Sequence, residues 1–314
     1  MPDVNLKELR YLVAVADHLH FGRAAEACFV SQPTLSTQLK KLEEQLGVQL
    51  VERTNKQVML TPVGREIVSR ARRVLGEVAE LIAQAESASD PLSGALRLGA
   101  IPTLGPYLLP HLVPALRDKL PRLQPLLYED QTERLLGRLR RGEIDGALMA
   151  TPVEGRDLVV SHLFDEPFVL AVPKGHVLSR KAGIDFDDLR PERLLLLEEG
   201  HCLRDQALEV CALAGAAEAT EFRATSLETL RQMVAAGGGV TLLPALAAEA
   251  NATVPNHNAV VLERFRAPVP EREIALFWRK GSARAPALEA VAEITSGLEI
   301  VQHLRDRYEL RVTA

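Results

Sequence analysis

Apolar and polar residues alternate in short runs over the first 60 residues, and three of these runs have helical spacing. The apolar positions of the first run are Leu6, Leu9, Leu12, Val13 and Ala16. A second short helix is predicted over residues 21–28 and a third over residues 30–47. Residues 48–60 then alternate like two short strands joined by a polar turn. This order predicts a winged helix-turn-helix domain, to which we assign residues 1–60.

The third predicted helix has clear start and stop signals. Ser31 can cap its N-terminus, and Pro33 falls in the first turn, where proline is tolerated. Gly47 can end the helix in a left-handed conformation.

A longer helix is predicted in the segment 61–90, which follows the wing. Its apolar residues recur at alternating spacings of four and three, at Ile67, Ala71, Val74, Val78, Leu81 and Ala85. This heptad seam favours a linker helix that pairs with its copy in a homodimer. The alternative is a single amphipathic helix that lies on its own core.

Beyond a linker-like stretch at residues 87–94, strand and helix patterns alternate. Strands are predicted at residues 95–101, 123–129, 144–150, 167–173, 193–199, 221–225, 239–244 and 272–280. Helices are predicted at residues 105–120, 132–142, 201–215, 226–237 and 285–300. This rhythm predicts parallel sheets covered on both faces, with a ligand crevice at the carboxyl ends of the strands.

We expect this regulatory part, residues 91–314, to form two α/β lobes. Lobe I takes residues 91–165 and 269–303, and lobe II takes residues 166–268. The fold class is therefore α + α/β: a winged helix-turn-helix, a long linker helix and a two-lobed regulatory domain.

Composition narrows the class of protein only a little. The chain has 314 residues, 47% of them hydrophobic and 25% charged, which is ordinary for a globular protein. Neither a signal peptide nor an apolar run of about 18 residues is visible, so we expect a cytoplasmic protein without membrane contact. The net charge of −5 argues against wholesale non-specific binding to nucleic acid but leaves a local DNA-reading surface open.

The third helix carries small hydroxyl and amide side chains that suit a DNA major groove. No acidic residue stands between Ala27 and Leu42. The candidate DNA-binding residues are Gln32, Pro33, Thr34, Ser36, Thr37 and Lys40 on this helix, with Arg53 and Lys56 of the wing placed to meet phosphate. An ordinary polar surface helix is the alternative.

Two of the three cysteines, Cys202 and Cys211, lie nine positions apart in one predicted helix. Nine helical residues rise about 13.5 Å, whereas a disulfide needs Cα atoms within about 7 Å. The pair therefore cannot bond while this helix persists, and its spacing does not form a metal site. Because cytoplasmic thiols are kept reduced, we do not expect a permanent disulfide. Two interpretations remain: a redox-active pair, or two unrelated structural thiols.

The surroundings of the two sulfurs differ. Cys202 begins the predicted helix, next to His201 and near Arg204, and helix-end donors and cations favour its thiolate. Cys211 has apolar neighbours, which favour a neutral thiol. We therefore expect Cys202 to be the nucleophile and Cys211 the resolving thiol, whereas Cys28 is expected to pack in the helix-turn-helix core.

The stretch from Leu6 to Arg53, followed by LTPVG at residues 60–64, resembles the N-terminal domain of LysR-type transcriptional regulators. The resemblance implies a linker helix followed by two lobes like those of periplasmic binding proteins. It also implies that Gln32, Pro33, Ser36 and Thr37 face the bases, although the family often has a basic residue where Thr37 stands. Most members bind a small organic effector between the lobes.

Residues 100–110, 129–136, 198–208 and 225–244 resemble the peroxide-sensing members of that family. The resemblance implies that Cys202 reacts with hydrogen peroxide and that Cys211 resolves it in a disulfide. It implies further that Thr103 and Thr132 hold peroxide or a bridging water. Tuning of the pocket would come from His201, Arg204 and Asp205.

The implied protein is a homodimeric or homotetrameric regulator, not an enzyme, and it uses neither cofactor nor metal. Its implied partners are promoter DNA, hydrogen peroxide, RNA polymerase and a thiol reductant of the glutaredoxin or thioredoxin type. Two alternatives stay open: a LysR-type regulator that answers to an ordinary metabolite, and a thiol peroxidase that uses the same two cysteines for turnover.

Overall fold

The computed structural model describes residues 4–53, 58–87, 90–153, 155–250 and 259–308. The chain divides into two compact units. The first holds residues 1–85 with the short stretch 141–143, and the second holds residues 86–140 and 144–314. Among the described residues, no helix is both long and apolar enough to cross a lipid bilayer.

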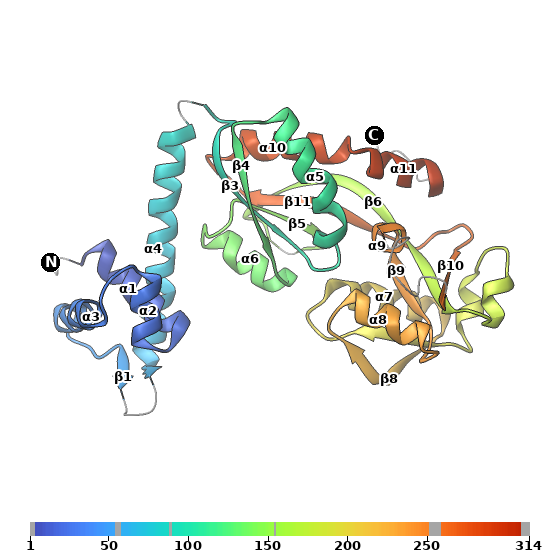
Figure 1. The fold of residues 1–314 in the computed structure, drawn as a ribbon, viewed down its shortest axis with the longest axis horizontal. Helices are drawn as coiled ribbons and strands as arrows, with labels where there is room; N and C mark the ends of the chain where they lie inside the picture. Colours follow the sequence, from blue (N-terminus) through green and yellow to red (C-terminus); the bar gives the residue numbers. More distant parts are fainter. Residues whose placement is uncertain (1–3, 54–57, 88–89, 154, 251–258, 309–314) are drawn as a thin grey trace. The chain divides into compact units, whose positions relative to one another are not determined.

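The first unit is a winged helix-turn-helix followed by a long helix (Figure 1). Its elements are α1 (Leu6–His18), α2 (Phe21–Ala27), α3 (Gln32–Leu46), β1 (Val51–Arg53), β2 (Val58–Leu60) and α4 (Pro62–Ser87). The two strands pair antiparallel as the wing. Leu12 of α1 and Leu35, Leu39 and Leu42 of α3 are fully buried in its core. The prediction of a winged helix-turn-helix is therefore confirmed.

The apolar positions of α4 divide between two environments. Val68 and Ala71 are buried in the core of the first unit, and Ile67 packs against the same core. Farther along, Val74 and Leu81 are exposed. The first two positions of the predicted seam thus serve the unit's own core, as the single-helix interpretation expected, and only the later part of the seam is free to meet a second copy. The side chain of Ala85 lies outside the described part.

The second unit contains the lobes. Its elements are β3 (Gly94–Ala100), α5 (Gly105–Lys119), β4 (Leu123–Glu129), α6 (Thr132–Arg140), β5 (Gly146–Ala150), β6 (Leu158–Pro173), η1 (Val177–Arg180), η2 (Phe186–Leu189), β7 (Arg193–Leu197), α7 (Cys202–Ala214), β8 (Ala217–Ala224), α8 (Leu227–Ala235), β9 (Thr241–Pro244), α9 (Ala245–Ala250), β10 (Val260–Arg264), β11 (Glu271–Arg279), α10 (Ala285–Ser296) and α11 (Glu299–Tyr308). Its largest sheet, within the described residues, runs in the order β10-β6-β11-β5-β3-β4, and β9 also pairs with β6.

This sheet is mixed, not parallel as the alternating pattern predicted. β3 pairs in parallel with β4 and β5, but β11 pairs antiparallel with β5 and β6. The reason is that β11 returns from lobe II without a crossover helix, so it enters the sheet of lobe I from the opposite end.

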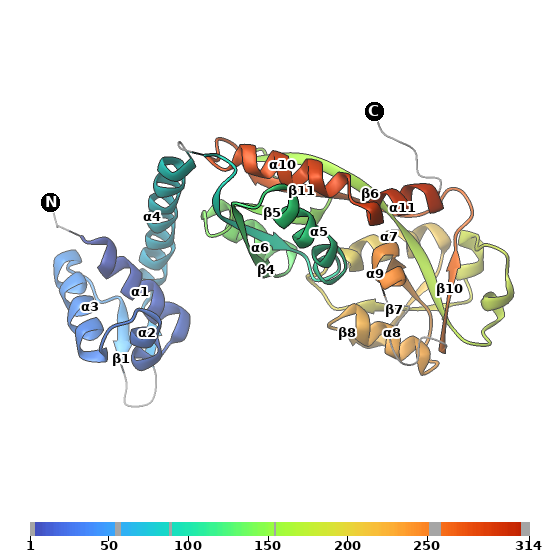
Figure 2. The same ribbon diagram turned by 45° about the horizontal axis from the view of Figure 1, so that its top comes forward.

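The two lobes share β6, which is longer than predicted and passes from one to the other (Figure 2). Its residues 158–167 pair with β11 in lobe I, whereas residues 168–173 pair with β9 and β10 in lobe II. The remaining strands of lobe II, β7 and β8, pair in parallel beside them. Its apolar residues form two clusters, one that contains Phe168 and Leu203 and one that contains Cys211.

The last predicted helix, 285–300, is in fact two helices. α10 ends at Ser296, and α11 begins at Glu299. Val301 and Leu304 of α11 are buried in the lobe I core, so the chain packs on this lobe beyond the predicted end at residue 303.

Candidate functional site

Helix α7 begins and ends within one residue of the predicted bounds 201–215. It begins at Cys202 after Gly200, whose φ of +93° is in the left-handed region, and it ends at Gly215, with φ of +67°. A side chain at Gly200 would come within 2.8 Å of the Gln131 side chain in lobe I. The start of α7 therefore lies against the loop that leads into α6.

The two thiols of α7 face different lobes. Cys202 is half-buried and packs against the lobe I core. Cys211 is buried in lobe II, in a cluster with Val210 and Leu196, and burial raises the pKa of its thiol. Both cysteines are free, and nine residues of one helix separate them by about 13.5 Å along its axis. The predicted separation of the two cysteines on an intact helix is confirmed.

Thr103 is part of a buried polar cluster that the sequence analysis missed. Its hydroxyl oxygen accepts a hydrogen bond from Nη1 of Arg272 at 2.9 Å, and its carbonyl accepts one from Nη2 at 3.0 Å. Arg272 also pairs with Glu166 at 2.8 Å, and both side chains are fully buried. In the sequence, Glu166 and Arg272 stand out only as charged residues at the start of apolar strand patterns. The Arg272 guanidinium thus fixes Thr103 at the end of β3.

Thr132 and Gln206 bring two further polar groups to the contact between α7 and lobe I. Thr132 is the first residue of α6, and its buried hydroxyl has no hydrogen-bond partner within the described residues. Gln206 donates from Nε2 to the carbonyl of Thr151 at 3.4 Å, and its buried Oε1 is likewise without a partner among the described groups. Both are therefore buried polar atoms with no hydrogen-bond partner among the described residues.

The three residues expected to tune the pocket have different surroundings. His201 is buried, which lowers its pKa, so its ring is neutral at pH 7. Arg204 donates to Glu218 of β8 at 2.8 and 2.9 Å and to the carbonyl of Leu197. Asp205 is exposed. The sequence predicts that cations near Cys202 favour its thiolate, but in the structure the His201 ring is neutral and the Arg204 guanidinium is paired with Glu218.

The DNA-reading face expected on α3 is exposed. The Ser31 side chain accepts a hydrogen bond from the backbone N–H of Thr34 and caps the helix. The side chains of Gln32, Pro33, Thr34, Thr37 and Lys40 are exposed, and that of Ser36 is half-buried. The Arg53 side chain and all of Lys56 lie outside the described residues.

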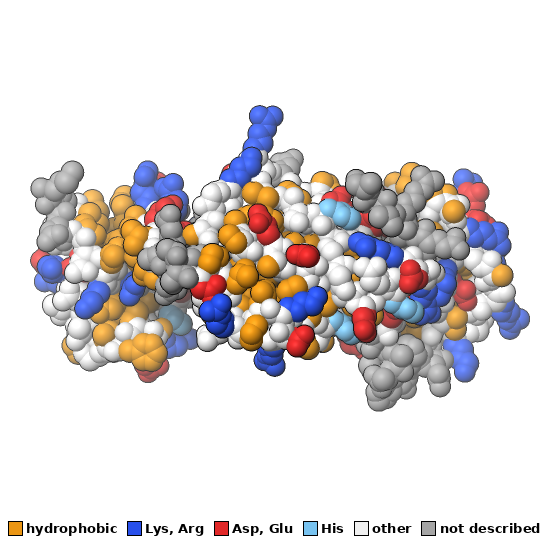
Figure 3. Space-filling view, turned by 90° about the horizontal axis from the view of Figure 1, so that it is seen from above, with side chains coloured by type: hydrophobic (Ala, Val, Ile, Leu, Met, Phe, Trp, Pro, Cys, Tyr) orange, Lys and Arg blue, Asp and Glu red, His pale blue; other side chains and the backbone are white. Residues whose placement is uncertain are grey.

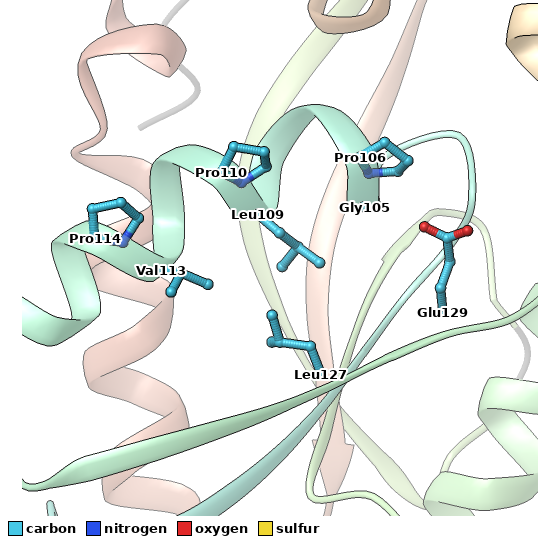
Figure 4. A pocket seen from close by; sticks show the side chains of 8 residues that line it. All are labelled: Gly105, Pro106, Leu109, Pro110, Val113, Pro114, Leu127 and Glu129. Atoms are coloured by element: carbon cyan, nitrogen blue, oxygen red, sulfur yellow. The ribbon is translucent and has the colours of Figure 1, made fainter.

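Cys28 and a groove between α5 and β4 are not part of this site. Cys28 is half-buried against the core of the first unit, as expected. A groove of about 410 Å³ lies between α5 and β4, where Leu109 and Leu127 point towards one another and Glu129 stands at one end (Figure 4). None of its lining residues is a predicted site residue.

Hydrophobic side chains gather over lobe I in the view of Figure 3, whereas acidic and basic side chains are interspersed over lobe II.

Residues 6–65 match the family described as bacterial regulatory helix-turn-helix protein, lysR family, and residues 89–297 match the LysR substrate binding domain. A relative from Escherichia coli O6:H1, named hydrogen peroxide-inducible genes activator, is 48% identical over 290 residues, which are 92% of this chain and 94% of the relative.

Two solved structures are similar over nearly the whole chain. A full-length OxyR from Pseudomonas aeruginosa, in which aspartate replaces one cysteine, has a TM-score of 0.75 and 41% identity, and the match covers 95% of this chain and 97% of that one. A hydrogen peroxide-bound cysteine-to-serine mutant of Corynebacterium glutamicum OxyR has a TM-score of 0.66 and 35% identity, with 100% and 98% covered. On these matches in sequence and structure, the chain belongs to the LysR family of transcriptional regulators.

Proposed function

We propose that this chain is a transcriptional regulator that senses hydrogen peroxide through Cys202 and answers by forming a disulfide with Cys211. The observation that carries the proposal is the placement of two free thiols on one helix, one against lobe I and one inside lobe II. A bond between them requires α7 to refold, which makes the oxidation a conformational signal. The relative named as a peroxide-inducible activator and the peroxide-bound neighbour support the same stimulus.

Cys202 is the reacting thiol in this proposal. It is half-buried and is the first residue of α7, and the thiolate is the nucleophilic form of a cysteine. The thiolate attacks one peroxide oxygen, the O–O bond breaks, and the other oxygen leaves as hydroxide and takes up a proton to become water. The hydroxyls of Thr132 and Thr103 and the amide of Gln206 are the groups that would hold peroxide beside the sulfur. His201, Arg204 and Asp205, all within three residues of Cys202 in the chain, tune this pocket.

Cys211 resolves the sulfenic acid. Its thiol attacks the oxidised sulfur, the S–S bond forms and water leaves, so one peroxide is reduced and two thiols are oxidised. Because a disulfide needs Cα atoms within about 7 Å, the turns of α7 between the cysteines must unwind. Unwinding takes Arg204 from Glu218 and Gln206 from Thr151, so contacts of both lobes change.

The DNA-binding part is the domain 1–60, with Gln32, Pro33, Thr34, Ser36, Thr37 and Lys40 of α3 towards the groove and Arg53 of the wing towards phosphate. The linker 61–90 pairs two copies, and the regulatory domain 91–314 carries the signal to the paired heads. We propose promoter DNA, RNA polymerase and a glutaredoxin- or thioredoxin-type reductant as partners in the cytoplasm, a homotetramer as the assembly, and oxidative-stress defence genes as the targets.

The test uses the full chain with a promoter fragment. Stoichiometric peroxide is added, the Cys202–Cys211 peptide is mapped by mass spectrometry, and the DNA footprint is recorded in the same sample. We expect the disulfide and the footprint to change together, Cys202→Ser to abolish both, and the matched variant Cys28→Ser to abolish neither.

Three outcomes would contradict the proposal. A footprint that still shifts in Cys202→Ser shows that another group senses peroxide. Steady peroxide consumption with a reductant at enzyme-like rates identifies a thiol peroxidase, and stoichiometric metabolite binding without redox response identifies an ordinary LysR-type regulator.

A further inference from the structure

Phe29 stands in the turn between α2 and α3 with its side chain turned away from the protein. The side chain is 96% exposed, whereas those of its neighbours Cys28 and Val30 pack against the core of the first unit. Val30 thus already supplies the apolar contact that fixes the entry into α3. Phe29 contributes none of its ring to the fold.

The backbone at Phe29 is strained as well. Its φ of +55° is in the left-handed region, which glycine or asparagine usually occupies at the end of a helix. The turn is held there because Phe29 N–H donates to the Glu26 carbonyl and Val30 N–H donates to the Ala25 carbonyl, each at 3.0 Å. A bulky aromatic residue at this position has a strained backbone and an exposed ring, and glycine would have neither. In the free protein neither property is compensated, so the residue points to a partner.

The position identifies the partner. Phe29 comes two residues before Ser31, the cap of α3, and three residues before the exposed residues Gln32-Pro33-Thr34. In the proposed function this helix end enters the major groove, so a residue just outside it meets the edge of the groove. DNA offers apolar surface there, either as the thymine methyl group or as the deoxyribose ring.

We propose that Phe29 is a further DNA-contacting residue, whose ring packs on the apolar surface of the duplex beside the bases that α3 reads. The inference rests on the proposed DNA-binding role of α3. Affinity then comes from removing an aromatic ring from water on binding, and the strained turn keeps that ring directed outward.

The test compares Phe29→Asn with the wild-type full chain. Asparagine tolerates the left-handed backbone but lacks the ring. The probe is a labelled duplex that the wild-type protein selects from a random-sequence pool. We expect about tenfold weaker binding by fluorescence anisotropy, a thermal midpoint that is unchanged or higher, and recovery of affinity in Phe29→Tyr. The matched control Val177→Asn removes another exposed apolar side chain, in lobe II, and is expected to leave affinity unchanged.

A second duplex carries deoxyuridine in place of thymidine. A loss of wild-type affinity on this duplex, absent in Phe29→Asn, assigns the contact to thymine methyl groups. An equal effect of Phe29→Asn on both duplexes assigns it to deoxyribose.

Unchanged affinity in Phe29→Asn, measured beside a Gln32→Ala variant that does weaken binding, overturns this inference and leaves the proposed function standing. A wild-type protein that selects no duplex at all overturns both.

Discussion

The ion pair between Arg204 and Glu218 joins the first turn of α7 to β8, and its loss should make the Cys202–Cys211 disulfide easier to form. The side chains are only 9% and 17% exposed, and the two hydrogen bonds measure 2.8 and 2.9 Å. Unwinding of α7 breaks the pair, so the pair stabilises the dithiol form selectively. The perturbation is Glu218→Gln, which keeps the shape and one acceptor oxygen but removes the charge.

The magnitude follows from the degree of burial. Breaking a fully buried pair costs about 3–5 kcal/mol, whereas an exposed pair contributes about 0–1 kcal/mol. Because this pair retains slight exposure and glutamine keeps one hydrogen bond, we expect a loss of about 2 kcal/mol in the dithiol form. For a two-electron couple, about 1.4 kcal/mol corresponds to 30 mV. The reduction potential of the disulfide should therefore become more negative by about 40 mV.

The assay equilibrates the full chain in dithiothreitol buffers of graded potential and traps free thiols by alkylation before mass spectrometry. The matched control is Glu199→Gln, because Glu199 is 79% exposed and pairs with Arg223 at 3.5 Å. The control should shift the potential by less than about 10 mV. An unchanged potential in Glu218→Gln, together with a lower unfolding midpoint of the reduced protein, would show that the pair survives in the disulfide form and refute the unwinding.

Four further outcomes follow from the same geometry. Iodoacetamide should alkylate Cys202 much faster than Cys211 at pH 7, because burial raises the pKa of Cys211; peptide mass spectrometry at timed intervals checks the order, and equal rates would contradict it. Burial lowers the pKa of His201, so its contribution to folding stability is present above pH 6.5 and is lost as the pH falls towards its folded pKa. Calorimetry from pH 7.5 to 5.5 should show this loss, and His201→Gln should flatten it. The pKa of Glu218 is lowered, chiefly by the hydrogen bond from Arg204, so the stability from this carboxylate is present above its ordinary pKa of 4.5 and is lost below it; Glu218→Gln should remove that acid-side slope. Arg272→Met should cost about 3–5 kcal/mol in denaturant unfolding, because Glu166 is then a buried, uncompensated charge, and a cost below about 1 kcal/mol would contradict this.

The sequence predicts α7 and α3 well because the residues that begin and end these helices lie next to them in the chain. The glycines that bound α7 and the serine that caps α3 act within one turn of the helix, so spacing alone places Cys202 and Cys211 nine residues apart on one helix. The same holds for the exposed residues of the first turn of α3.

Contacts between distant segments are not predictable in this way. Glu166 and Arg272 are separated by 106 residues and meet only because β6 and β11 pair antiparallel, a register that the strand patterns do not specify. The periodicity of α4 is ambiguous for the same reason, because it is the same whether Ala71 packs within the unit or against a second copy.

Refolding α7 has a conformational cost, and this cost determines how stable the disulfide is against a reductant. Unwinding the first turns exposes Leu203, at about 2 kcal/mol, and breaks the Arg204–Glu218 pair, at about 2 kcal/mol. Closing a loop of about ten residues costs the unwound chain a further amount of conformational entropy, roughly 2.5–3 kcal/mol. The free energy released by reducing peroxide has to offset these terms, and each kcal/mol among them lowers the stability of the disulfide by about 20 mV. Each buried contact of the helix therefore sets the thiol–disulfide potential at which a reductant returns the regulator to the dithiol form, without any contact to peroxide itself.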